Sequence, residues 1–134
     1  MSMFEIVFSP TGGTEKVSGL VTGALDGNIV TVDLTDSGLD FHGVSMAKGD
    51  VAVISVPSYA GRVPAVAVER LGMVRGNGAR AVLVCVYGGR AFEDTLIELE
   101  DVAKRAGFRV VAAVSAIAEH SVARQFAAGR PDAQ

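Results

Sequence analysis

The segment that best predicts the fold of this chain is residues 4–14, Phe4-Glu5-Ile6-Val7-Phe8-Ser9-Pro10-Thr11-Gly12-Gly13-Thr14. The apolar run at the start of this segment is typical of a buried strand, and a helical pattern begins just after the segment. Three hydroxyl side chains and two adjacent glycines therefore stand where a first strand turns into a first helix. Backbone N–H groups at a helix start, hydroxyl donors and a close backbone approach together suit a phosphate. Because the segment contains no lysine, we expect this phosphate to belong to a cofactor that stays bound, rather than to be a group that is transferred.

Short apolar runs alternate with helical patterns along the rest of the chain. The patterns predict strands at residues 4–8, 28–33, 50–56, 80–87 and 108–115, and helices at residues 16–25, 65–74, 92–106 and 121–128. Residues 34–49 show little helical periodicity, so the second crossover is expected to be short or irregular. Strands that alternate with helices imply right-handed crossovers and a parallel sheet. The predicted fold is therefore α/β and doubly wound, with five strands in the order 2-1-3-4-5 and helices on both faces.

Two of the predicted helices carry a recognisable apolar face. The first is expected to bury Val17, Leu20, Val21, Ala24 and Leu25. The helix at 92–106 carries Phe92, Leu96, Leu99, Ala103 and Ala106 at alternating spacings of four and three, which is an amphipathic pattern. The acidic residues of the same helix are expected to form its solvated face; these are Glu93, Asp94, Glu98, Glu100 and Asp101.

Length and composition favour one globular domain over residues 1–134. Hydrophobic residues make up 49% of the 134 residues, which is enough for a core. The formal net charge of −3 and the absence of a basic cluster argue against a nucleic-acid partner. The sequence contains no run of about 18 apolar residues, so no membrane-spanning segment is predicted. The first residues resemble no signal peptide, so a cytoplasmic location is expected.

Cys85 is the single cysteine, and it lies inside an apolar run. One cysteine excludes a disulfide framework, a cysteine-ligated zinc site and a cysteine-ligated iron–sulfur cluster within this chain. The sequence therefore predicts no metal site, and Cys85 is expected to be a buried small hydrophobic residue.

Ligands of open parallel sheets bind beyond the carboxyl ends of the strands, where the strand order reverses. Loop one (9–14), loop three (57–63), loop four (87–90) and loop five (118–121) are predicted to lie there. Tyr59 and Tyr87 offer aromatic faces for a flat ring, and Gly61, Gly88 and Gly89 permit close backbone approach. The same residues also fit plain tight turns and surface packing.

The charged residues of these loops carry the same two interpretations. Arg62 and Arg90 fit solvated surface charges as well as ligand contacts, and His120 in loop five fits a structural histidine.

The pattern as a whole resembles flavodoxin. Ser9-Pro10-Thr11-Gly12-Gly13-Thr14 fits the family's FMN-phosphate signature, [ST]-x-T-G-x-T, and loops three and four fall where flavodoxins cover the two flavin faces. More narrowly, the chain looks like the N-terminal flavodoxin module of bacterial and archaeal flavodoxin–ferredoxin fusion proteins. That likeness rests on residues 8–14, Pro57-Ser58-Tyr59-Ala60-Gly61-Arg62-Val63-Pro64, residues 86–92 and Ala118-Glu119-His120-Ser121.

The resemblance implies an FMN site. Its residues would be Ser9, Pro10, Thr11, Gly12, Gly13, Thr14, Pro57, Ser58, Tyr59, Ala60, Gly61, Arg62, Val63, Tyr87, Gly88, Gly89, Arg90 and Phe92. A cation beside the flavin would favour its anionic reduced form, so Arg62 or Arg90, if it faces inward, is expected to raise the reduction potential of the flavin. The fusion proteins continue into a cysteine-rich ferredoxin module, which this chain does not contain. Any iron–sulfur cluster would then lie on another polypeptide or on a missing segment. The short final helix is expected to leave apolar surface exposed, which favours a homodimer.

These features lead to an FMN-binding electron-transfer module that passes electrons between a redox donor and an iron–sulfur or other acceptor protein. An electron carrier is favoured over a self-sufficient enzyme. Two alternatives remain: an NAD(P)H-dependent FMN or quinone reductase on the same fold, and a flavin-free scaffold. A receiver domain would need an acidic pair after the first strand and an aspartate ending the third. The chain has Ser9-Pro10 and Pro57 there instead.

Overall fold

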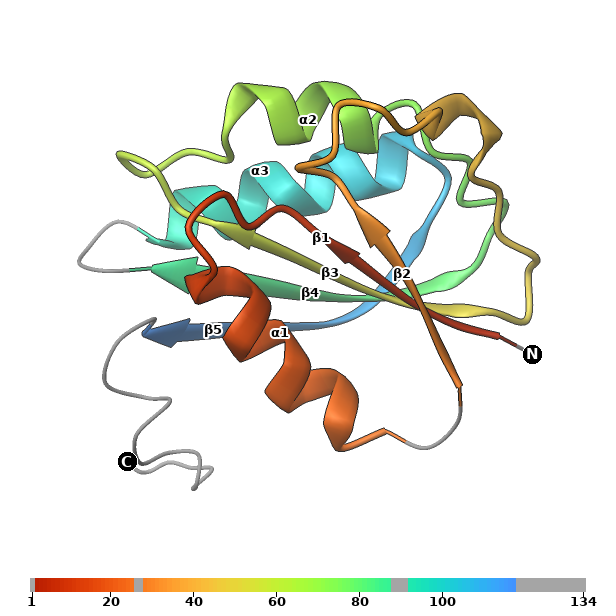
Figure 1. Cartoon of the computed structure of the whole chain (residues 1–134), viewed down its shortest axis with the longest axis horizontal. Coiled ribbons are helices and arrows are strands. Elements are labelled where there is room, and N and C mark those ends of the chain that lie inside the picture. Colours follow the sequence, from red (N-terminus) through yellow and green to blue (C-terminus); the bar gives the residue numbers. More distant parts are fainter. Residues whose placement is uncertain (1, 26–27, 88–91, 118–134) are drawn as a thin grey trace.

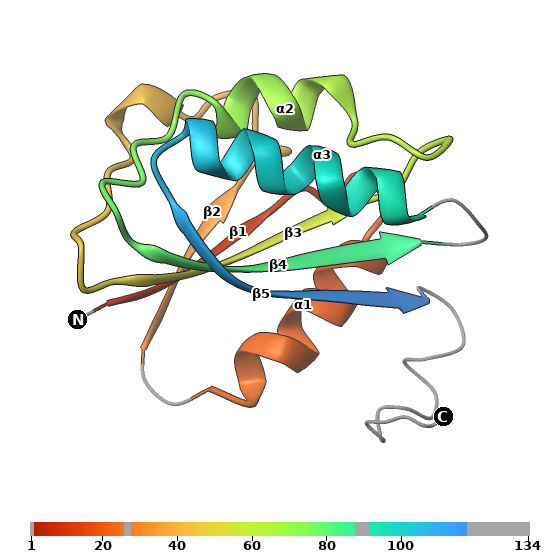
Figure 2. The same cartoon turned by 180° about the vertical axis from the view of Figure 1, so that it is seen from behind.

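The computed structural model describes residues 2–25, 28–87 and 92–117, which form one five-stranded sheet flanked by helices. The strands are β1 (Met3–Val7), β2 (Ile29–Asp33), β3 (Val51–Pro57), β4 (Arg80–Tyr87) and β5 (Arg109–Ile117), and all neighbouring pairs are parallel. The strand order is β2-β1-β3-β4-β5. Helix α1 (Gly13–Gly23) lies on one face, and α2 (Ala65–Leu71) and α3 (Phe92–Arg105) lie on the other (Figures 1 and 2). The predicted α/β fold and its strand order are confirmed.

Most predicted boundaries lie close to those of the structure. Each strand begins and ends within two residues of its predicted limits, whereas α1 begins three residues earlier, at Gly13. Helix α2 ends at Leu71, before the predicted residue 74. The second crossover contains only one short 3₁₀ turn, η1 (Phe41–Gly43), as its weak periodicity indicated. The predicted helix at 121–128 lies outside the described residues. None of the described helices is long and apolar enough to cross a membrane.

The core lies mainly between the sheet and the pair α2 and α3. Ile6, Ile54 and Leu83 on the three central strands are fully buried, and Leu71 and Leu99 meet them from the two helices. Central parallel strands covered on both faces explain why their sequences are almost continuously apolar. This core fixes the carboxyl ends of β1, β3 and β4 side by side at one edge of the molecule.

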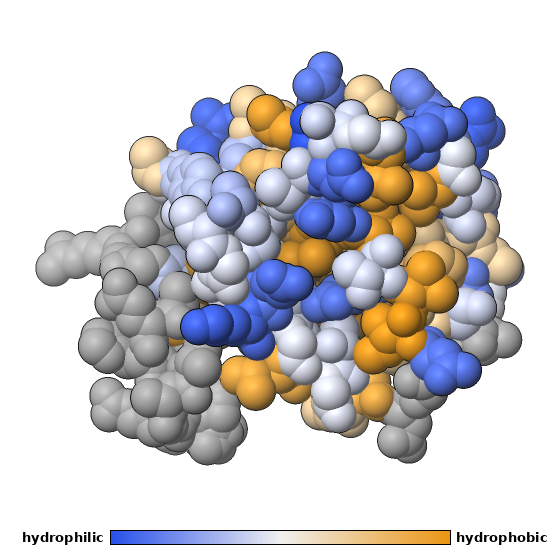
Figure 3. Space-filling view, in the orientation of Figure 1, coloured by the Kyte–Doolittle hydropathy of each residue, from blue (hydrophilic) through white to orange (hydrophobic). Residues whose placement is uncertain are grey.

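The buried face of α1 matches the predicted one only in part, at the buried Val17 and the partly buried Val21. The side chains that it buries are those of Thr14, Val17, Ser18 and Thr22, whereas Leu20 is 49% exposed and Leu25 is 37% exposed. A buried polar contact accompanies this arrangement, in which the Ser55 hydroxyl of β3 donates a hydrogen bond of 2.7 Å to the Ser18 hydroxyl. Burying small hydroxyl side chains lets the helix lie close to the sheet. Apolar patches consequently remain on this surface among polar side chains (Figure 3).

This rotation of α1 can be tested with two alanine variants. Val17→Ala removes a buried side chain and is expected to lower the free energy of unfolding by about 2 kcal/mol. Leu20→Ala removes more carbon atoms from an exposed position and is expected to change it by less than about 0.5 kcal/mol. Urea denaturation of both variants measures the difference, and a loss in Leu20→Ala as large as that in Val17→Ala would show that Leu20 is buried as predicted.

Cys85 is fully buried on β4, which confirms its interpretation as a core residue. Burial raises the pKa of its thiol to about 11. Almost no thiolate is therefore present at pH 8, and a thiol reagent is expected to label the unfolded chain but not the native one. Rapid stoichiometric labelling of the native protein at pH 8 would contradict this prediction.

Candidate functional site

Loops one and three leave the carboxyl ends of β1 and β3, which are neighbours in the sheet. They meet at the point where the strand order reverses, which is the usual ligand position in such sheets. Tyr87 ends β4 beside them and is half-buried. Gly88, Gly89, Arg90 and His120 lie outside the described residues, and so does the side chain of Phe92. Among the described residues, the structure thus brings together two of the four loops predicted to lie at the ligand position.

Loop one forms a cradle of unused backbone donors. Gly12 has φ +91°, in the left-handed region, and Gly13 then starts α1 in a right-handed conformation. This alternation turns successive N–H groups toward one point and forms an anion-binding nest. The backbone N–H groups of residues 11–14 have no hydrogen-bond partner within the described part of the chain. The positive end of the α1 dipole adds to the attraction for an anion.

Two hydroxyl groups complete the cradle. The Ser9 hydroxyl accepts a 3.0 Å hydrogen bond from the Glu15 N–H and keeps its own proton free to donate. Thr14 is only 4% exposed, and its hydroxyl contacts no polar partner among the residues described. A buried hydroxyl without a partner is costly, which makes it a candidate ligand contact. Residues 9–14 therefore fit a phosphate group.

Thr35 lies beside this cradle and is not among the residues predicted to form the site. The Thr35 hydroxyl, in the turn after β2, accepts a 2.9 Å hydrogen bond from the Ser9 N–H. Asp33 holds Thr35 in turn, because its carboxylate accepts a hydrogen bond from the Thr35 N–H at 2.9 Å. The only sequence signal for Thr35 is its place two residues after the end of β2, the strand next to β1.

Loop three contains a tight, fixed turn. Tyr59 and Arg62 exchange two backbone hydrogen bonds of 2.9 Å across it. The central residues Ala60 and Gly61 have φ +53° and +78°, the signature of a type I′ turn. A left-handed alanine stores strain of about 1 kcal/mol or more. The turn presents Tyr59 with 46% of its surface exposed, so the aromatic face predicted there is accessible.

Two residues of α3 anchor loop three. The Glu98 carboxylate accepts hydrogen bonds of 2.9 Å from Arg62 Nε, Arg62 Nη2 and the Val63 N–H. The hydroxyls of Ser58 and the fully buried Thr95 lie 2.6 Å apart and share a hydrogen bond. Glu98 is therefore not simply part of a solvated face, as its spacing suggested. Glu100 and Asp101 do lie on the exposed side, where they pair with Lys104 and Arg105.

The stability of the Arg62–Glu98 ion pair depends on pH. Hydrogen bonding to the Arg62 guanidinium holds the pKa of the Glu98 carboxyl below its ordinary value, and the Val63 N–H adds to this effect. A carboxyl whose pKa is depressed on folding contributes its stability above its ordinary pKa and loses it as the pH falls through the lowered value. The pair is therefore intact at neutral pH and opens only in acid.

A pocket of about 640 Å³ lies between loop one, loop three and the start of α2. This volume is typical of small-molecule sites. Tyr59 and Pro10 reach the pocket from the two loops, and the Arg62–Glu98 pair lies on its rim. Its apolar wall is lined by Phe8, Val63, Pro64, Val66 and Val68.

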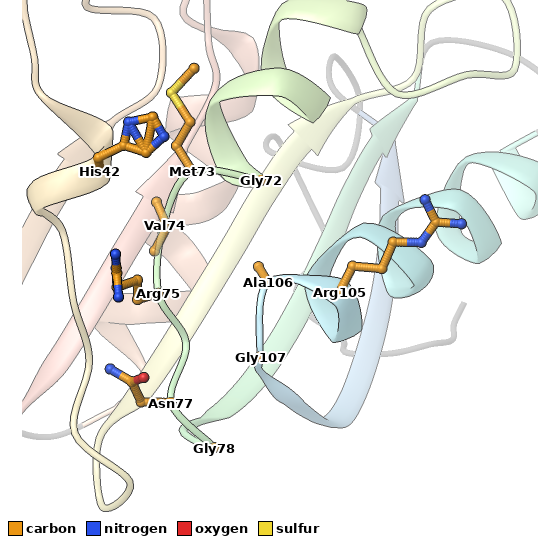
Figure 4. Close-up of a pocket in the computed structure, with 10 residues that line it drawn as sticks. All are labelled: His42, Gly72, Met73, Val74, Arg75, Asn77, Gly78, Arg105, Ala106 and Gly107. Carbon is orange, nitrogen blue, oxygen red and sulfur yellow. The ribbon is translucent and has the colours of Figure 1, made fainter.

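Another pocket, of about 510 Å³, lies at the opposite end of the sheet, near the amino ends of β4 and β5. Figure 4 shows that its arginines, Arg75 and Arg105, extend in different directions. Arg105 is also paired with Asp101 at 3.1 Å. The pocket contains none of the residues predicted to bind a cofactor, and its cations do not converge on one point.

Neither a protein-family model nor a curated protein sequence matches this chain. Solved structures do match it. A flavodoxin from Streptococcus pneumonia TIGR4 is 20% identical, with 92% of each chain covered and a TM-score of 0.65. Flavodoxin 1 from Bacillus cereus is 14% identical over 92% of this chain and 90% of that one, with a TM-score of 0.66. An NADH:FMN oxidoreductase, EMOB, is 15% identical over 92% and 83%, also with a TM-score of 0.66. At these identities the likeness is one of fold.

Proposed function

We propose that this chain is an FMN-binding, flavodoxin-like electron-transfer module. The observation that carries the proposal is the cradle at residues 9–14. It offers four backbone N–H groups and a buried Thr14 hydroxyl, all without partners among the described residues. The likeness in fold to flavodoxins and to a Lactobacillus acidophilus flavoprotein in complex with FMN supports the same choice of ligand.

The roles of individual residues follow from their chemistry. The loop-one N–H groups and the hydroxyls of Ser9 and Thr14 would donate hydrogen bonds to the FMN phosphate, and no lysine is needed to hold it. Tyr59 and Tyr87 would contact the ring, while backbone amides of loops three and four would meet its polar edge. Bound FMN supplies electron-transfer chemistry, and the protein holds and tunes it.

Titration of the purified chain with FMN tests the proposal. Quenching of flavin fluorescence is expected to saturate at one FMN per chain with a Kd below about 1 µM. Lack of binding at micromolar FMN would overturn the proposal and leave the flavin-free scaffold as the better interpretation. Rapid bleaching of the bound flavin by NADPH alone would instead favour the reductase on the same fold.

The electron-transfer role also needs a partner protein. We propose an iron–sulfur protein of the ferredoxin type, which the resemblance to flavodoxin–ferredoxin fusion proteins implies. Its cluster would lie on that partner, because the single cysteine of this chain cannot hold one. Stopped-flow mixing of the reduced, FMN-loaded chain with an oxidised ferredoxin is expected to show flavin reoxidation. Absence of electron transfer to ferredoxins would direct attention to another class of acceptor.

A further inference from the structure

Loop three is held by side chains that the FMN proposal does not require. Thr95 and Glu98 are three residues apart on α3 and therefore lie on one face of that helix. Thr95 meets Ser58, just before the Tyr59–Arg62 turn. Glu98 meets Arg62 and Val63 at the end of the turn. The turn is thus held at both ends by contacts with the same helix.

The contacts of Glu98 also determine where the charge of Arg62 lies. Arg62 Nε and Nη2 each lie 2.9 Å from a different oxygen of the same carboxylate, which is the bidentate geometry of a strong ion pair. The carboxylate is largely covered, with 21% of the Glu98 side chain exposed against 72% for Arg62. The guanidinium is therefore turned toward α3 with its charge balanced, which removes the reason to expect that Arg62 raises the cofactor potential.

We propose that Glu98 is a positioning residue for the flavin site, which fixes the Tyr59–Arg62 turn and keeps the positive charge of Arg62 neutralised beside it. The inference rests on the proposed FMN function. A turn fixed before binding does not lose conformational freedom on binding, which favours affinity. A balanced charge leaves the anionic reduced flavin without extra stabilisation, which keeps the reduction potential low.

The positioning role is tested first in the flavin-free protein. Glu98→Ala removes both oxygen acceptors, so hydrogen exchange at the Val63 N–H is expected to become roughly tenfold faster or more. Glu100→Ala is the matched control, because it removes a glutamate from the exposed side of the same helix, and it should leave this exchange rate unchanged. Equal exchange rates in the Glu98→Ala variant and the wild type would overturn the inference, whether or not the protein binds FMN.

The FMN-loaded protein gives a second test of the same role. The Kd for FMN is expected to rise about tenfold in Glu98→Ala and to stay close to the wild-type value in Glu98→Gln, which keeps one acceptor oxygen. An unchanged Kd in Glu98→Ala would count against the inference. Failure of the wild-type chain to bind FMN would instead refute the proposed function, and the exchange experiment separates these two failures.

Redox titration tests whether Glu98 neutralises the charge of Arg62 or only supports the structure of loop three. Glu98→Gln leaves Arg62 uncompensated and is expected to raise the midpoint potential of bound FMN, whereas Arg62→Gln leaves the carboxylate and is expected to lower it. The double variant is expected to return close to the wild-type potential, because it removes both charges. Shifts of the same sign in the two single variants would refute the neutralising role.

Discussion

Replacing Thr11 with aspartate is expected to raise the Kd of this protein for FMN about 100-fold. Thr11 is exposed in loop one, and its N–H is one of the unused donors of the cradle. A carboxylate there would face the phosphate, and repulsion at contact distance together with lost hydrogen bonds costs about 2–3 kcal/mol. Fluorescence titration with FMN measures the change in Kd, and the free energy of unfolding should stay within about 0.5 kcal/mol of wild type.

The prediction has a matched control in helix α1, which follows loop one, and a second control in the choice of ligand. Gly19→Asp makes the same change of charge about two turns into α1, at a position where an added side chain meets open space. It is expected to leave the Kd within about twofold of the wild-type value. Riboflavin has the same ring without the phosphate, so Thr11→Asp should bind it as the wild type does. An equal loss of affinity for both ligands would show that loop one does not hold a phosphate.

The cradle could be predicted from sequence because its features are local. Glycine at positions 12 and 13, hydroxyls at 9 and 14 and a strand–helix junction all lie within one short segment, and the strand order follows from the alternation of elements. Glu98 could not be predicted in the same way. Its spacing on α3 places it beside truly solvated acids, and only the fold brings it to the Val63 N–H, 35 residues away in sequence.

The face of α1 shows a second limit of pattern reading. Hydropathy predicts that Leu20 and Leu25 are buried. Which side chains of α1 are buried depends instead on how close the helix lies to the sheet. Ser18 can reach Ser55 only if the helix lies close to β3, and a leucine at that position would be too large. The energy of this close packing depends on the partner strand, so it cannot be predicted from the periodicity of the helix sequence alone.

Gly76→Ala is expected to cost about 2–3 kcal/mol of unfolding free energy, although the sequence marks Gly76 only as part of a turn after α2. An added Cβ would lie 2.7 Å from the Gly107 carbonyl carbon and 2.7 Å from the Phe108 nitrogen. Both are backbone atoms that cannot rotate away. The Gly76 N–H donates a 2.7 Å hydrogen bond to the Ala106 carbonyl, so separating the two segments would also break this contact.

Thermal unfolding measures this effect, and a fall in Tm of roughly 10 °C is expected for a domain of this size. Gly49→Ala is the control, because a Cβ there meets nothing within 4 Å, and its Tm should stay close to that of wild type. The Gly76 turn lies near the amino ends of β4 and β5, whereas the cradle lies at the carboxyl end of β1. Below its Tm, Gly76→Ala should therefore bind FMN with an unchanged Kd. Thr11→Asp is expected to do the opposite, since it changes the Kd and leaves the stability unchanged. A Gly76 variant as stable as wild type would mean that the turns at 76–78 and 106–108 do not pack as closely as this fold requires.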